Sequence, residues 1–132
     1  MYDTLLYMLR QGVVDWNRWR RDNPQIIPNL RGANLRGFDI RGVDFSGADF
    51  SSTDFNSANL NSADLSLANL IGPILRGADF CGTNLSNANF RGADLSGADF
   101  SNANLSGADL SGADLSSANL SGADLSLADL GW

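Results

Sequence analysis

The sequence predicts an all-β solenoid with a short N-terminal α-helical cap, and three observations support this fold class. A large apolar residue recurs at every fifth position from Leu30 to Leu130 without an insertion or deletion. Two positions after this residue, glycine occurs at twelve of twenty positions. Residues 1–27 lack the repeat and instead space their apolar residues as helices do.

Residues 1–27 are predicted to form the helical cap. Asp3 or Thr4 is suited to begin a helix, Gly12 can divide it in two, and Pro24 ends it. A terminal coil would otherwise expose its apolar core, so a covering helix is expected. Trp16 and Trp19 have two interpretations, a ligand or partner site and a plain core role, and the core role is favoured.

Residues 28–132 contain 21 repeats with the consensus Ala-(Asp/Asn)-(Leu/Phe)-Ser-Gly, whose third residue we call the centre, position i. Five residues advance about 500° around an α-helix, which leaves no common apolar stripe. In one long strand, alternate centres would point to opposite faces because five is odd. The chain must therefore turn within every repeat. Positions i−2 and i then face inward, i−1 faces outward, and a corner forms at i+1 and i+2, where glycine suits positive φ.

The repeats Ala33–Gly37, Ala93–Gly97 and Ala108–Gly112 resemble those of the pentapeptide-repeat proteins, and the resemblance covers about four fifths of the chain. It implies a right-handed quadrilateral β-helix with four repeats per coil, and therefore just over five coils. The centres would stack in four columns, one of which contains Phe45 and Leu85. The segment from Val14 to Pro24 is similar to the leader of many bacterial, notably cyanobacterial, members.

The composition argues against an enzyme. The 132 residues include no His and a single cysteine, Cys81, so neither a His-dependent triad nor a thiolate metal cluster can form. The glycine spacing matches neither a dinucleotide fingerprint nor a phosphate loop. We therefore expect no catalytic residues, no cofactor and no metal.

The sequence also predicts a cytoplasmic protein without membrane association. No segment approaches the roughly 18 consecutive apolar residues of a membrane span. The N-terminus lacks the positively charged region of a signal peptide. The lone cysteine fits a reducing compartment.

Four apolar residues are predicted to face outward and form a candidate interaction patch. Ile74 stands at the only i−1 position that is not Asp or Asn, and Ile71 is at i+1. Leu67 and Leu127 are at i+2 in one column, three coils apart. An exposed apolar patch can mark a partner surface. Alternatively, Ile71 and Ile74 simply flank a locally distorted corner around Pro73, and both interpretations stay open.

The charge is uneven along the chain. The nine Arg and fifteen Asp give net charges of +2 for residues 1–45, −2 for 46–91 and −6 for 92–132. The N-terminal arginines are interpreted as solvated, and the overall charge of −6 without lysine argues against direct nucleic-acid binding. The candidate acidic surface, for which a solvated face is the simplest interpretation, comprises Asp94, Asp99, Asp109, Asp114, Asp124 and Asp129.

The C-terminal end of the rod is a candidate dimer site, comprising Leu130 and Trp132. Exposed strand edges invite pairing, so either Trp132 covers the last coil or two molecules meet there. A homodimer is favoured because one tryptophan is too small to cover a square coil. The resemblance agrees, since some family members dimerise through their C-terminal ends.

Two functional classes follow. The first is a non-enzymatic scaffold that binds an unknown protein partner, as expected of a rigid rod without catalytic groups. The second is implied by the resemblance, because some pentapeptide-repeat proteins imitate a DNA duplex and engage type II topoisomerases such as DNA gyrase. The acidic residues of 92–132 fit that alternative, whereas the short rod without an interrupting loop departs from it.

Overall fold

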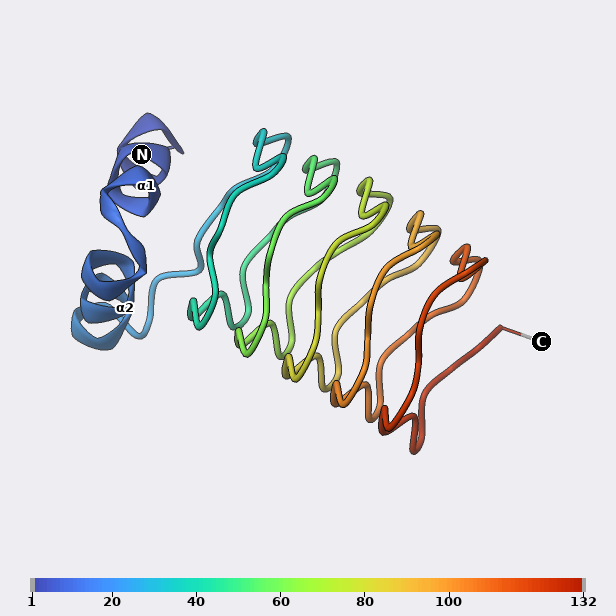
Figure 1. The fold of residues 1–132 in the computed structure, drawn as a ribbon. Coiled ribbons are helices and arrows are strands. Elements are labelled where there is room, and N and C mark those ends of the chain that lie inside the picture. Colours follow the sequence, from blue (N-terminus) through green and yellow to red (C-terminus); the bar gives the residue numbers. More distant parts are fainter. Residues whose placement is uncertain (1, 132) are drawn as a thin grey trace.

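The computed structural model describes residues 2–131, which form two helices followed by a stack of coils (Figure 1). Helix α1 spans Tyr2–Gln11 and helix α2 spans Val13–Asp22. Gly12 separates them with φ 128°, as the sequence predicts. Both helices lie at one end of the stack, and the C-terminus lies at the other (Figure 1). Neither helix in the described part of the chain has the length and apolarity that a membrane crossing requires.

Each coil contains four repeats, because parallel bridges link residues that are twenty positions apart. The series runs from Asn29 with Asp49 to Asp109 with Asp129. The Leu30 N–H donates to the Asp49 carbonyl at 2.9 Å, and the Asp49 N–H donates to the Pro28 carbonyl at 2.9 Å. The same pair of hydrogen bonds recurs along every side of the rod. The chain is therefore a repeat β-helix with the predicted coil period, whereas its right-handed sense stays a prediction.

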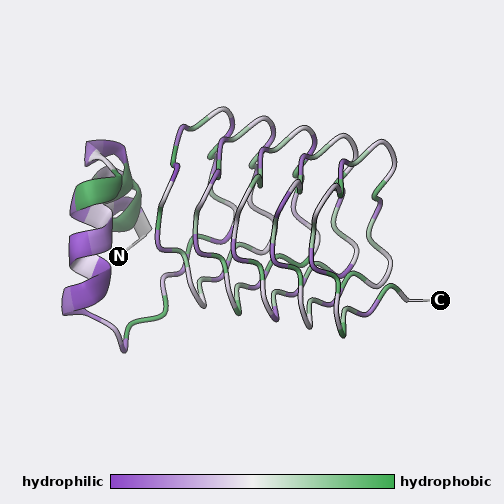
Figure 2. Cartoon of the chain, turned by 60° about the horizontal axis from the view of Figure 1, so that its bottom comes forward, coloured by the Kyte–Doolittle hydropathy of each residue, from purple (hydrophilic) through white to green (hydrophobic). Residues whose placement is uncertain are grey.

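The centres and the small residues at i−2 fill the core. Leu85 is fully buried, as are the other centres from Leu30 to Leu105 with the slight exception of Ile40. Phe80 and Phe100, one coil apart, stack with ring centroids 4.9 Å apart and an interplanar angle of 3°. Apolar and polar segments alternate along every coil (Figure 2). The inward columns thus lie where the five-residue period places them.

A four-residue turn forms the corner of almost every repeat. The Ala33 N–H donates to the Leu30 carbonyl at 3.0 Å, and the third residue of this turn, Gly32, has φ 67°. A positive φ at that position is typical of a type II turn and favours glycine. Eight other residue positions have positive φ without being glycine: Ser52, Ser57, Ser62, Leu67, Asn87, Asn102, Ser117 and Leu127.

Helix α2 is fixed against the first coil by buried side chains. The Trp16 Nε1–H donates to the Asp44 carbonyl at 2.7 Å, and its ring meets Phe45 edge-on with centroids 5.3 Å apart. Arg20 donates to the carbonyls of Ile26 and Ser46. Trp16 therefore has a core role, and the buried Arg20 is not the solvated arginine that the sequence indicates. Helix α2 thus lies beside the first coil, and the capping role of residues 1–27 stays a prediction.

Candidate interaction surface

All four residues of the predicted patch are exposed, but they do not form one cluster. The exposed fractions are 68% for Leu67, 43% for Ile71, 48% for Ile74 and 95% for Leu127. Ile71 and Ile74 flank one corner, whereas Leu67 and Leu127 belong to the preceding corner of their coils, three coils apart. The patch therefore consists of an isoleucine pair and a separate leucine column.

The corner between the two isoleucines is locally distorted. Pro73 has no N–H, so it cannot donate the turn hydrogen bond to the Leu70 carbonyl that other corners contain. The Ile74 N–H reaches the Thr53 carbonyl at 3.3 Å, and the Asp94 N–H reaches the Pro73 carbonyl at 3.3 Å, whereas most equivalent distances are 2.8–3.0 Å. The locally distorted corner that one interpretation expects is therefore present. The exposed apolar side chains that the partner-surface interpretation expects are present as well.

The two leucines of the column are held in a backbone conformation that disfavours them. Leu67 has φ 61° and Leu127 has φ 59°, in the region where glycine is the default residue. A residue with a Cβ atom is destabilised there by about 1–2 kcal/mol. Both leucines are thus costly to the fold as well as exposed to solvent.

The aspartates at i−1 brace the corners rather than simply facing solvent. Oδ1 of Asp99 accepts the N–H of Ser101 at 2.8 Å. Oδ1 of Asp109 accepts both the N–H and the hydroxyl of Ser111, at 3.0 and 2.6 Å. Asn104 accepts the N–H of the residue two positions later in the same way, at 3.0 Å. The corner therefore requires the side-chain oxygen but not its charge.

These hydrogen bonds favour the ionised carboxylates. In five of these aspartates, the hydroxyl of the serine two positions later is the largest cause of a lowered carboxyl pKa. The backbone N–H of the same serine lowers the pKa further. Arg76 also lowers the pKa of Asp94. The carboxyl groups with a lowered pKa are those of Asp94, Asp99, Asp109, Asp114 and Asp124.

Part of the candidate acidic surface is neutralised by arginines of the preceding coil. Arg76 forms an ion pair with Asp94, and Arg91 lies 4.0 Å from Asp109. Within residues 2–131, the other four carboxylates have no ion-pair partner: Asp99, Asp114, Asp124 and Asp129. These four occupy all four sides of the rod, so the acidic charge encircles it instead of covering one face.

The last coil exposes apolar side chains at its end. Leu115, Leu120 and Leu125 are only partly buried, and Leu130 is 37% exposed. They line a depression of about 470 Å³ together with Leu110. In the described part of the chain, the backbone N–H groups of these partly buried leucines have no backbone acceptor. Trp132, the other predicted end residue, lies outside the described residues.

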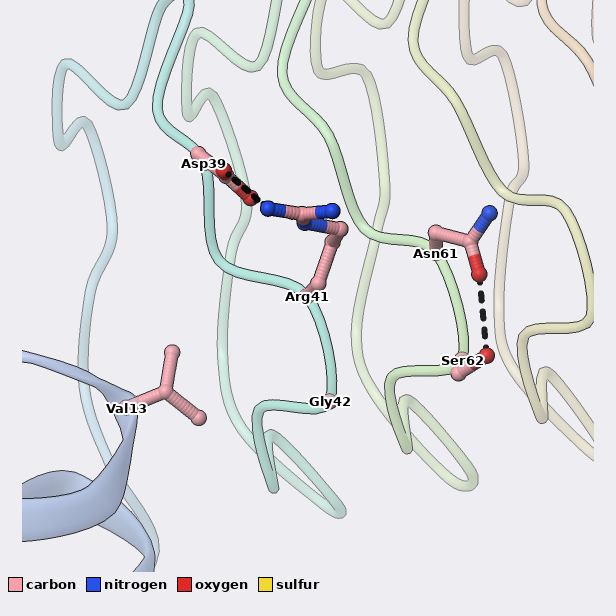
Figure 3. Close-up of a pocket in the computed structure, with 6 residues that line it drawn as sticks. All are labelled: Val13, Asp39, Arg41, Gly42, Asn61 and Ser62. Carbon is pink, nitrogen blue, oxygen red and sulfur yellow. Dashed lines mark hydrogen bonds and ion pairs between the residues drawn. The ribbon is translucent and has the colours of Figure 1, made fainter.

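A second, open depression of about 590 Å³ lies between α2 and the first two complete coils (Figure 3). Arg41 donates two hydrogen bonds to Asp39, at 2.8 and 2.9 Å, and the Ser62 hydroxyl donates to Asn61. Its polar groups are therefore paired with one another rather than directed toward a ligand. Among residues 2–131, no three His, Cys or Asp side chains come together as a metal site.

Comparisons with known proteins identify relatives of the chain. The family described as pentapeptide repeats matches residues 29–66, 63–102 and 93–131. The structure of the pentapeptide-repeat protein Rfr23 from the cyanobacterium Cyanothece 51142 is similar, with 27% identity, a TM-score of 0.65, and coverage of 87% of this chain and 95% of that one. A pentapeptide-repeat protein from the Arabidopsis thaliana thylakoid lumen is 38% identical, with a TM-score of 0.59 and coverage of 69% and 67%, respectively. No curated protein matches the sequence. The predicted resemblance is thus confirmed.

The bracing role of the aspartates predicts different outcomes for two replacements of Asp99. Asp99→Ala removes the acceptor for the Ser101 N–H and should lower the free energy of unfolding by about 1 kcal/mol. Asp99→Asn keeps an oxygen acceptor and should change stability much less. Urea denaturation of both variants measures the difference, and equal losses would contradict the bracing role.

The lowered pKa values also predict the direction of acid sensitivity. A carboxyl group whose pKa is lower in the folded state stabilises the fold above the unfolded pKa of about 3.9, and this stabilisation is lost as the pH falls through the folded pKa. The midpoint temperature of thermal unfolding should therefore decrease as the pH is lowered below about 4. A variant with Asn at positions 99, 114 and 124 should show a smaller fall in calorimetry.

Proposed function

Since the chain belongs to the pentapeptide-repeat family, we propose that it is a rigid, non-enzymatic scaffold that binds a partner protein. Members of this family are generally structural or interaction proteins. Hydrogen bonds between coils and a continuous core support the rigidity. The same proposal includes a right-handed quadrilateral winding of the coils, a capping role for residues 1–27 and a cytoplasmic location.

The observation that carries this proposal is the cost of the isoleucine pair to the fold. At i−1, Ile74 supplies no oxygen to accept the Arg76 N–H, which Asp or Asn does elsewhere. Both isoleucines are also nearly half exposed. Residues that break a local rule without a gain inside the chain are candidates for contact with another molecule.

Restoring the consensus should separate stability from binding. In the variant Ile71→Ser/Ile74→Asn, the new amide oxygen can accept the Arg76 N–H, so the free energy of unfolding should rise by about 1 kcal/mol. Recovery of the partner from a lysate of the source organism should fall, because the apolar side chains are gone. Chemical denaturation and quantitative affinity capture measure the two effects.

The matched control for this variant is Ser117→Gly. Ser117 has φ 58° and lies two coils beyond the corner that follows Ile74, so glycine should stabilise the fold without altering partner recovery. Unchanged recovery with the isoleucine variant would leave only the distorted-corner interpretation of these residues.

A second candidate function is an acidic rod that imitates DNA and binds a type II topoisomerase such as DNA gyrase. The four carboxylates without an ion-pair partner in residues 2–131 favour it. Two observations count against it: Arg76 and Arg91 neutralise part of the acidic surface, and the carboxylates are hydrogen-bonded to their own corners.

A supercoiling assay with excess protein decides between the two functions. The scaffold proposal predicts no effect on gyrase. If the protein inhibits the enzyme, a variant with Asn at positions 99, 114, 124 and 129 tests the cause, because asparagine preserves the corners and removes the charge. Loss of inhibition in that variant would establish the acidic mechanism.

We also propose that two copies associate end to end through the last coil. Among residues 2–131, the centre N–H on each side of this coil has no backbone acceptor, as at Leu115, and the carbonyl two residues earlier has no backbone donor, as at Ala113. Two such coils related by a two-fold axis run antiparallel and can exchange these hydrogen bonds. Apolar contact around Leu130 would add to the association.

Light scattering over a range of protein concentrations tests the end-to-end dimer. Association should strengthen at high salt, because Asp114, Asp124 and Asp129 bring like charges to the interface. Leu130→Asp should weaken it, with a smaller loss of stability than at a fully buried centre, since Leu130 is 37% exposed. A monomer at the highest concentration and high salt would refute the proposal.

A further inference from the structure

One of the four corner edges of the rod carries no charged residue. This edge, which we call the serine edge, consists of Ser at every i+1 position and the residue that follows: 46–47, 66–67, 86–87, 106–107 and 126–127. All five arginines of the repeats lie on the other three edges: Arg31, Arg36, Arg41, Arg76 and Arg91. The serine edge is therefore chemically distinct along the length of the rod.

Large apolar side chains protrude from this edge at intervals. Leu67 and Leu127 are 68% and 95% exposed. Ile27 is 70% exposed and continues the column, because Pro28 pairs with the next coil as Ala48 does. At a coil spacing of about 4.8 Å, Leu67 lies about 10 Å from Ile27 and about 14 Å from Leu127 along the rod.

Between the two leucines, no large side chain projects from the edge. Only Asn87 and Gly107 occupy the intervening i+2 positions. A Cβ atom on Gly107 would lie 2.4 Å from Oδ1 of Asn87, so the Asn87 side chain lies along the edge over Gly107 instead of projecting from it. The two leucine positions are about 14 Å apart centre to centre, so the two side chains can contact opposite flanks of one α-helix, whose diameter with side chains is about 10–12 Å.

The backbone indicates that these leucines are not retained for folding. Both have positive φ, where the other i+2 positions from 32 to 122 contain Gly, Ser or Asn. A large side chain in this conformation weakens the fold and gains no burial within the chain. Such an outlier points to contact with another molecule.

Negative charge borders the edge on both sides. Asp64 and Asp124 lie on the side of the coil before the edge, and Asp129 lies on the side after it. None of the three has an ion-pair partner within residues 2–131. A complementary partner has an apolar stripe bordered by positive charges.

We infer that the serine edge binds a basic amphipathic helix of another protein, which lies across the edge between Leu67 and Leu127. This inference rests on the proposed scaffold function and identifies the chemistry of its partner. The apolar stripe of the helix contacts the two leucines, and its lysines or arginines face Asp64, Asp124 and Asp129.

The experiment uses the full chain and a synthetic helical peptide with a leucine stripe bordered by lysines. Two control peptides carry glutamate in place of lysine or serine in place of leucine. Fluorescence anisotropy should detect binding of the Leu/Lys peptide alone. Equal binding of either control peptide would overturn the inference.

Variants of the protein locate the binding. Leu67→Gly/Leu127→Gly keeps every charge and relieves the positive φ, so the fold should be stabilised while peptide affinity falls about tenfold or more. Replacing Asp64, Asp124 and Asp129 by Asn should weaken binding several-fold and reduce its salt dependence. Ser117→Gly should change neither, and undiminished affinity in the leucine variant would refute the serine edge as the site.

Partner capture separates this inference from the scaffold function on which it rests. If the leucine variant loses both the peptide and the native partner, both proposals are supported. If the partner is lost only with Ile71→Ser/Ile74→Asn, the scaffold function stands and the serine edge is excluded. If neither variant changes recovery of the partner, the serine edge is excluded, whereas the scaffold function itself fails only if the unchanged protein recovers no partner.

Discussion

The hydrogen bonds between successive coils are the constraint on which the whole rod depends. Each side of an inner coil pairs with the same side of the preceding coil and of the following coil, twenty residues away in each direction. The backbone is satisfied only if every repeat keeps five residues, and this requirement fixes the register of the side chains. Core columns, bracing aspartates and corner edges all inherit their positions from it.

Much of this architecture can be predicted from the sequence because the five-residue period separates inward from outward positions. The period cannot show what an outward side chain does. Asp99 is outward, as predicted, but its oxygen is bound to the Ser101 N–H. The recurrent Asp-x-Ser spacing is a signal for this, since Asp and Asn commonly bond the backbone two residues later. The burial of Arg20 could not be predicted, because it depends on the Ser46 carbonyl, 26 residues away, as well as on the nearby Ile26 carbonyl.

Charge and folding are largely separable in this chain. Asp and Asn brace a corner with the same oxygen, so a repeat can gain or lose a negative charge while its hydrogen bonds remain. The net charge can therefore differ along the rod while the corner hydrogen bonds remain the same. The leucine column is different, since Leu67 and Leu127 change the backbone energetics as well as the surface.

The distorted corner at Pro73 also affects how strongly the two halves of the rod are coupled. In a linear array each unit is stabilised by its nearest neighbours, so cooperativity passes from one end to the other through every junction. The missing turn hydrogen bond and the two 3.3 Å contacts weaken the junction in the middle of this array. The two halves are consequently coupled less tightly than a uniform repeat would couple them, and local fluctuations should concentrate at this hinge-like seam.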